Sequence, residues 1–261
     1  GQSRLVDRHN APQRQPALAD LRPGLDMRPD PGGAVTIDAG GTSQIFYIYD
    51  APHVGALNVT ISGLTLTRGY DFVWGGGAIA SWSANTTLRD ITITNSTAVG
   101  STAQHGRGGA ILHALSANQQ GRDAILTLEN CHISGNSAGI QRQDAAARAV
   151  LDRVSVVGNT STGQAAAAIS LDHTNGATDI VSSTIADNTG GGVGGVDATA
   201  LRVLHSTVVG NSGTGVRSFN RGMSVNHSIL ADNTSDLGSS ADVNWSLVET
   251  GGSNIVAGGN N

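Results

Sequence analysis

Two acidic residues, a histidine and an arginine occupy equivalent places in similar stretches of the sequence and could form a catalytic group. Glu129 and Asp152 are 23 residues apart, and Arg89 stands 40 residues before Glu129. Two carboxyl groups about 5 Å apart form the pair used by retaining glycosidases. His132 follows Glu129 closely, so we expect it on the same strand as a further acid or base. One hypothesis is therefore a polysaccharide lyase or glycosidase. The alternative is a row of surface ion pairs worth about 0–1 kcal/mol each.

A second group is aromatic. Tyr70-Asp71-Phe-Val-Trp74 and the nearby Trp82 hold much of the aromatic content of a chain with only three Phe, three Tyr and three Trp. Exposed aromatic faces stack on sugar rings, and the Asp71 carboxylate could accept hydrogen bonds from sugar hydroxyls. The segment predicts a surface that binds a glycan or a protein partner. The alternative is a small satellite core beneath a loop.

A third group lies in the longest insertion, 97–124, which contains His105, Arg107 and His113. Long loops on a rigid scaffold often carry function, so these three residues are candidate binding residues. Two histidines at this spacing make a poor metal pair by themselves. We therefore expect no metal and no cofactor, and a mobile surface loop is the alternative interpretation.

An internal repeat supplies the element that would bring these distant positions together. Two apolar columns alternate with polar residues over short runs rich in β-branched side chains, which is typical of β-strands. Seven segments superpose, namely 58–69, 86–96, 126–136, 150–159, 179–188, 201–211 and 223–233. The columns read Ile61, Leu88, Leu128, Leu151, Ile180, Val203, Val225 and Leu66, Ile93, Ile133, Val156, Ile185, Val208, Leu230.

A polar column follows each repeat and consists of Asn136, Asn159, Asn188, Asn211 and Asn233. Asn tolerates the left-handed backbone of a tight turn. Amide side chains stacked at the ~4.8 Å strand spacing can each bond to the neighbour above and below. A further inward column ends in small polar residues that could bond along the stack, and it places Cys131 as a buried, inert thiol.

The repeat predicts an all-β fold, a right-handed parallel β-helix or solenoid of about eight coils with variable loops on one side. Equivalent residues are 22 to 40 positions apart, which fits a turn of roughly 22 residues with insertions. We assign 34–261 to this domain. Residues 1–33, rich in Arg and Pro, are expected to form a cap over the first open strand edges or a linker.

At this level of detail the sequence resembles the choice-of-anchor Q family of bacterial envelope proteins and the chlamydial polymorphic outer-membrane proteins. The second group is defined by GGA[ILV] and FxxN motifs. Gly76-Gly-Ala-Ile79 and Gly108-Gly-Ala-Ile111 match the first motif, and Ile133-Ser-Gly-Asn136 matches the second with Ile replacing Phe. The resemblance implies a β-helix on a secreted or surface-anchored bacterial protein, often within an adhesin, and it implies no catalytic residue.

Composition narrows the function further. The net charge is −5, so no basic footprint indicates nucleic acid, and no apolar run approaches the ~20 residues that span a bilayer. The signature residues of polygalacturonases and of pectate-lyase calcium sites are not found. The leading hypothesis is a non-enzymatic recognition module at the cell surface, with a glycan or a cell-surface protein as partner. A polysaccharide-active enzyme and a passive structural stalk are the alternatives.

Overall fold

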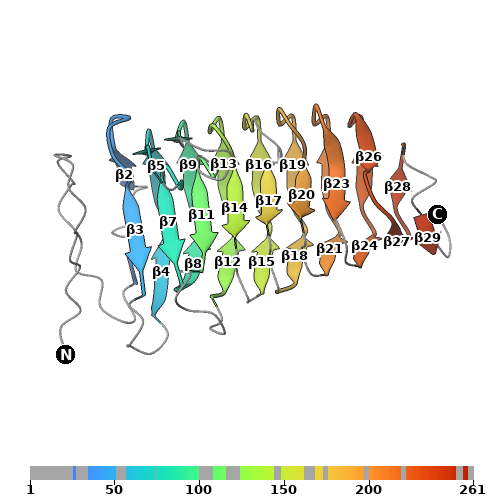
Figure 1. Cartoon of the computed structure of the whole chain (residues 1–261), viewed down its shortest axis with the longest axis horizontal. Helices are drawn as coiled ribbons and strands as arrows, with labels where there is room; N and C mark the ends of the chain where they lie inside the picture. The colour runs from blue at the N-terminus through green and yellow to red at the C-terminus, as the bar shows by residue number, and fades with distance from the viewer. Residues whose placement is uncertain are drawn as a thin grey trace.

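All regular structure in the described residues is β-strand. The computed structural model describes residues 26–27, 35–50, 57–73, 75–99, 108–115, 124–143, 148–161, 168–172, 176–196, 200–218, 222–250 and 255–257. The strands stack side by side along one long axis, in chain order from β2 at one end to β29 at the other (Figure 1). No helix that could span a membrane occurs in this part of the chain.

The strands form three long parallel sheets and one strand pair. Sheet A contains β1 (Asp26–Met27), β4 (Asn58–Ser62), β8 (Asn85–Arg89), β12 (Leu126–Glu129), β15 (Ala149–Asp152), β18 (Thr178–Val181), β21 (Leu201–Leu204), β24 (Met223–Asn226), β27 (Ala241–Asn244) and β29 (Ile255–Ala257). Sheet B contains β2 (Val35–Asp38), β5 (Leu64–Thr67), β9 (Thr92–Thr94), β13 (His132–Ser134), β16 (Ser155–Val157), β19 (Thr184–Ala186), β22 (Thr207–Val209), β25 (Ile229–Ala231) and β28 (Leu247–Val248).

Sheet C is the third long sheet. It contains β3 (Phe46–Tyr49), β7 (Ile79–Trp82), β11 (Ile111–Ala114), β14 (Ile140–Gln143), β17 (Ile169–Asp172), β20 (Val193–Val196), β23 (Thr214–Ser218) and β26 (Ser235–Leu237). The short pair is β6 (Tyr70–Asp71) with β10 (Thr97–Ala98). The chain passes through sheets A, B and C in turn and then returns to A. We call one such passage a coil, and the arrangement is that of a parallel β-helix or solenoid.

The two apolar columns read from the sequence are confirmed as the core. Leu88, Leu128 and Leu151 are register partners on consecutive strands of sheet A, and their side chains are buried. Ile93, Ile133 and Val156 do the same in sheet B. A third apolar row, which includes Ile79, Ile111 and Ile140, lines sheet C. Three rows of branched side chains therefore fill an interior with little room for rings.

The predicted asparagine ladder is confirmed. Five buried asparagines lie at the corner after sheet B, and the amide nitrogen of each of the first four donates to the amide oxygen of the asparagine in the next coil. The Nδ2–Oδ1 distances are 2.9 Å from Asn136 to Asn159 and 3.1 Å from Asn159 to Asn188. They are 2.9 Å from Asn188 to Asn211 and 2.8 Å from Asn211 to Asn233. Each of these four accepting Oδ1 atoms also accepts the backbone N–H of the preceding asparagine, and the Oδ1 of Asn136 accepts the backbone N–H of Ser96.

The expectation that these asparagines adopt the left-handed backbone is wrong. The positive φ angles fall one residue earlier, at Gly135 (65°), Gly158 (63°), Asp187 (54°), Gly210 (66°) and Asp232 (54°). Glycine and short polar residues tolerate this conformation. The turn is made at that position, which leaves the following asparagine free to point inward and bond along the stack.

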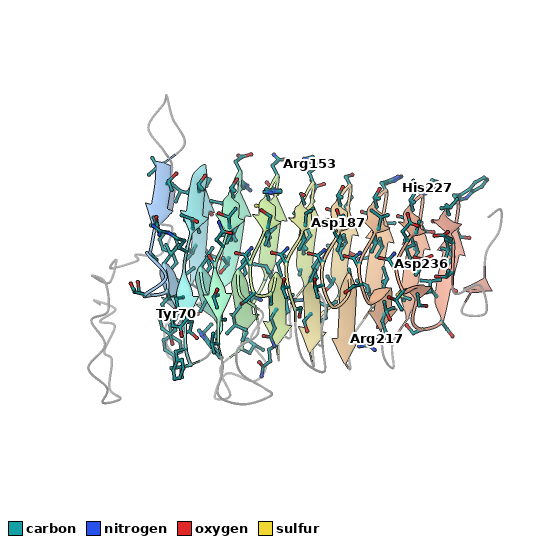
Figure 2. All side chains as sticks on the ribbon, turned by 90° about the horizontal axis from the view of Figure 1, so that it is seen from above. Tyr70, Arg153, Asp187, Arg217, His227 and Asp236 are labelled. Carbon is teal, nitrogen blue, oxygen red and sulfur yellow. The ribbon has the colours of Figure 1, made fainter. Side chains whose placement is uncertain are left out.

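The corner between sheets A and B has its own left-handed residue in each described coil from β4 to β28. Unlike the asparagine corner, it projects its side chains outward and uses varied residue types. These residues are Gly63, Asp90, Asn130, Arg153, Ser182, His205, His227 and Trp245. We call this set the A/B corner row. Figure 2 shows Arg153 and His227 along the same edge of the stack.

The inward position just after this corner is polar toward the C-terminal end, as the sequence predicted. Ser183, Ser206 and Ser228 are buried, and each Oγ accepts the backbone N–H of the equivalent residue one coil earlier at 3.0–3.1 Å. Cys131 occupies the same column. It is buried, and burial raises the pKa of its thiol to about 11, so the thiolate form that reacts with electrophiles is scarce.

Both GGA[ILV] motifs mark a place where the backbone has no room for a side chain. Gly76 and Gly108 have φ angles of 75° and 69°, and a Cβ there would lie 2.3–2.4 Å from the carbonyl oxygen three residues later. A larger residue would push the following strand out of sheet C. The motif therefore fixes how β7 and β11 enter that sheet.

Replacing Asn188 by Ala should cost about 2–4 kcal/mol of unfolding free energy. The change removes the acceptor of the backbone N–H and the amide of Asn159 and the donor to the Val156 carbonyl, and buried groups left unpaired are costly. Urea unfolding measures the loss. As the control, Thr184→Ala on the outer face of the same coil should cost less than about 1 kcal/mol. Equal losses for both variants would show that the ladder does not stabilise the stack.

Candidate functional site

The charged group predicted on sheet A is brought together. Glu129 lies between Arg89 and Asp152, each its register partner on a neighbouring strand. Arg89 Nε donates to Glu129 Oε2 at 2.7 Å, and Arg153 forms an ion pair with Asp152. Both carboxylates are thus already paired with guanidinium groups at a half-exposed surface, which is the arrangement of surface ion pairs.

His132 does not join this group on one strand, so that expectation is wrong. Asn130 has a φ of 52° and turns the chain at the A/B corner. Glu129 therefore ends β12 in sheet A, whereas His132 begins β13 in sheet B with an exposed side chain. The turn places the two residues on different faces of the stack.

A second ion-pair group on sheet A was missed by the sequence reasoning. The Asp179 side chain is only 4% exposed, and Arg148 and Arg202 bind it from either side. Arg148 Nε donates to Oδ2 at 2.7 Å and Arg202 Nε donates to Oδ1 at 2.6 Å. Asp179 and Arg202 are register partners. Asp179 and Arg202 occupy equivalent positions in two adjacent repeats, and this equivalence could have predicted the pair from the sequence.

The predicted aromatic group is partly described. Tyr70 is half-buried on β6. Trp82, at the end of β7 in sheet C, is half-buried and packs against a small cluster of Ala80, Leu112 and Ala114, as the satellite-core alternative predicted. Trp74 lies outside the described residues. The Asp71 carboxylate accepts the backbone N–H groups of Val73 at 3.1 Å and of Gly75 at 2.6 Å. Asp71 therefore closes its own turn.

Two further rings extend this surface. Tyr47 and Tyr49 on β3 stack with ring centroids 6.4 Å apart and planes at 17°. Tyr49 is the register partner of Trp82, so the aromatic side chains occur on neighbouring strands of sheet C. We call Tyr47, Tyr49 and Trp82 the sheet C aromatic surface. The alternation in Phe46-Tyr-Ile-Tyr49, with Phe46 and Ile48 buried, was the sequence signal for two outward tyrosines.

Of the three candidate residues in the insertion 97–124, only His113 lies in the described part of the chain. His105 and Arg107 lie outside the described residues. The expectation that His113 lies in an exposed loop is wrong, because it is part of β11 and is fully buried. Its Nε2 is 3.3 Å from the Ala84 carbonyl oxygen. All four residues of β11 are buried, so the alternation that identifies a strand with one exposed face is missing there.

The interior beside His113 also holds a fully buried arginine. Arg142 is the register partner of His113 on β14, and its Nη1 donates to Thr178 Oγ1 at 2.9 Å. Burial lowers the pKa of Arg142 to about 10. Burial also lowers the pKa of His113 to about 3, and the charge of Arg142 acts in the same direction. His113 is therefore neutral in the folded protein at neutral pH.

This buried histidine predicts a loss of stability in acid. The unfolded chain binds a proton near pH 6.5 and the folded chain only near pH 3, so the unfolded state holds more protons between these values. Unfolding free energy should fall by about 1 kcal/mol per pH unit below pH 6.5. His113→Gln, which keeps a donor for Ala84 but cannot titrate, should reduce this slope. Urea midpoints from pH 7 to 4.5 test it, and parallel curves would contradict it.

No group of three or more His, Cys, Asp or Glu side chains that could hold a metal ion is found in the described part of the chain. Comparison with protein-family models, with curated proteins and with solved structures finds no match.

Proposed function

We propose that this chain is a non-enzymatic recognition module of a bacterial surface or secreted protein, adhesin-like in architecture, which binds a glycan through exposed aromatic side chains. The observation that carries the proposal is the placement of its rings. Of the seven Phe, Tyr and Trp side chains in the described residues, only Phe46 is buried. Aromatic side chains commonly dominate protein cores, whereas here three of the other six rings are exposed and three are half-buried.

The sheet C aromatic surface suits a sugar ligand. Tyr47 is 41% exposed, and its stacking on Tyr49 holds both rings in one orientation before any ligand arrives, which lowers the entropy lost on binding. A tyrosine or tryptophan combines an apolar face with a polar tip. Such rings can meet the C–H face of a pyranose and hydrogen-bond to its hydroxyls together.

The architecture is consistent with the resemblance to surface β-helix proteins, and we extend it in two respects. We infer right-handed winding, because a connection between parallel strands of one sheet is right-handed in about 98% of cases. We also infer about eight coils from the repeat period. A rigid stack of this kind would hold the ligand-binding face away from the cell, with a glycan as the partner and the cell exterior as the location.

The two competing functions receive less support. An enzyme acting through Glu129 and Asp152 would need carboxylates available for proton transfer, and both already bind arginine. A passive stalk would need no exposed rings at all. The aromatic placement therefore favours recognition over both.

Replacing Tyr47 by Thr should weaken glycan binding about tenfold or more, because a central aromatic anchor commonly contributes 2 kcal/mol or more. Thr suits a strand, so the fold is kept, and Tyr47→Phe should retain most of the affinity. Screening on immobilised bacterial and host glycans followed by calorimetry measures the effect. Val35→Thr, which removes an exposed apolar side chain from β2, is the matched control.

Two outcomes would contradict the proposal. One is glycan binding that is equal in the wild type and in Tyr47→Thr. The other is release of new reducing ends or unsaturated products from acidic or neutral polysaccharides, if Glu129→Gln abolishes it. The second outcome would identify an enzyme that uses the sheet A carboxylates.

A further inference from the structure

The last three members of the A/B corner row form a stack of exposed rings that the sequence reasoning did not identify. The ring centroids of His205 and His227 are 4.9 Å apart with planes at 29°, and those of His227 and Trp245 are 6.3 Å apart with planes at 12°. The first spacing matches the ~4.8 Å distance between neighbouring strands. The repeat of the fold itself therefore aligns these rings face to face along the axis.

Backbone geometry holds the three rings outward. Their residues have φ angles of 49°, 50° and 53°, which turn the chain between sheets A and B in successive coils. The residue after each ring, Ser206, Ser228 or Ser246, points toward the interior and takes part in the serine hydrogen bonds. The rings thus stand on a corner that is fixed from inside by the stack.

An apolar strip lies beside the rings. Ile229 and Leu247 are register partners on β25 and β28 and are 48% and 58% exposed, while Trp245 is 59% exposed. Among the described residues, Trp245 is the last ring of the stack. The five residues thus offer an exposed indole, two exposed aliphatic side chains and the N–H groups of the ring edges, and none of the five carries a carboxylate or a guanidinium group.

We infer that His205, His227 and Trp245, with Ile229 and Leu247, form a second binding site that takes a neutral saccharide. The C–H face of a pyranose would rest on the indole and the aliphatic strip, and its hydroxyls would meet the ring-edge N–H groups. The ligand class rests on the proposed function, whereas the existence of the site rests on the ring stack alone.

Size separates a saccharide from a protein partner. Three coils span about 10 Å and two outward positions on a strand about 7 Å, and the exposed side chains on this footprint bring the patch to on the order of a few hundred Å². A stable protein interface buries about 800 Å² on each partner. One or two sugar rings fit the smaller area, and a folded partner does not.

The position of the site makes the module divalent. The ring stack lies at the corner between sheets A and B, whereas Tyr47 and Trp82 lie on sheet C. In Figure 2, His227 and Tyr70 stand on opposite edges and toward opposite ends of the stack. One molecule would thus hold two glycan chains on different sides, as a cross-linking adhesin requires.

The test uses the full chain with Trp74→Phe and Trp82→Phe, so that Trp245 is the only remaining tryptophan. Cellohexaose, maltohexaose, xylohexaose and chitohexaose are the probes. We expect at least one to shift the Trp245 emission with saturation. In the protein with its other residues unchanged, Trp245→Asn and His227→Asn should each lower the affinity of this site for that oligosaccharide about tenfold or more, as measured by calorimetry. Asn suits the left-handed backbone, so the turn is kept.

Ser182→Asn is the matched control, because Ser182 belongs to the same corner row with a φ of 50° but lies outside the ring stack. It should leave binding unchanged. The inference would be overturned if none of the four oligosaccharides shifts the fluorescence emission of Trp245. It would also be overturned if Trp245→Asn changes only the sedimentation coefficient of the protein and no saccharide affinity, because the patch would then serve self-association. If an oligosaccharide shifts Trp245 emission while Tyr47→Thr changes the affinity for no glycan, the sheet C proposal is wrong and this site is supported. If Tyr47→Thr weakens glycan binding while no oligosaccharide shifts Trp245 emission, only this second site is wrong.

Discussion

The amide-to-amide hydrogen bond between asparagines of consecutive coils is the interaction on which the rest of this structure depends. Each buried Asn bonds to backbone groups at its own corner and to the asparagine of a neighbouring coil. A slip of one residue in any coil from Asn136 to Asn233 would therefore break hydrogen bonds in two coils. The ladder ends at a carboxylate, which only accepts hydrogen bonds. Asp236 is fully buried and receives the Asn233 amide at 2.8 Å and the backbone N–H of Thr250 at 2.6 Å. In Figure 2 both Asp236 and Asp187 lie between the two edges of the view, but Asp236 is buried whereas Asp187 is exposed at the corner after sheet B.

Fixed register converts position in the repeat into position on the surface. The outward face of each sheet and the A/B corner row are columns in which one residue per coil contacts its neighbours. The contents of a column therefore decide what that surface does. Charges that alternate along sheet A neutralise one another, as Asp179 does between Arg148 and Arg202. Rings that follow one another, such as His205 and His227, stack and remain exposed. An interior of branched aliphatic rows has little room for rings, and this gives the few aromatic residues their surface role.

The sequence predicted what depends on alternation and failed where alternation was missing. The apolar columns that contain Leu128 and Ile133 could be recognised because polar residues alternate with them. Aligning these columns predicted that Arg89 and Glu129 lie side by side on neighbouring strands. Strand β11 was taken for a loop because its sequence does not alternate apolar and polar residues, as expected when all four residues are buried. Nothing in the sequence therefore indicated that His113 lies in the interior. The left-handed residue was misplaced by one position, since Asn is suited both to the turn and to the ladder. The ring of Trp245 was missed because its stacking depends on the corner that the residue occupies, and the repeat alone does not show which residues turn the chain. The outward ring of Tyr47 could have been predicted from the alternation in Phe46-Tyr-Ile-Tyr49.

Exchange of the asparagine side-chain amide protons with solvent, followed by NMR, tests the ladder most directly. If the coils are joined as described, the Nδ2 protons of Asn159, Asn188 and Asn211 will be protected as strongly as the backbone amides of the sheet B strands, because both open only when coils separate. Exposed amides such as that of Asn130 will exchange at once. Exchange of all these asparagines at the rate of exposed amides would contradict the ladder, and with it the register that positions both aromatic sites.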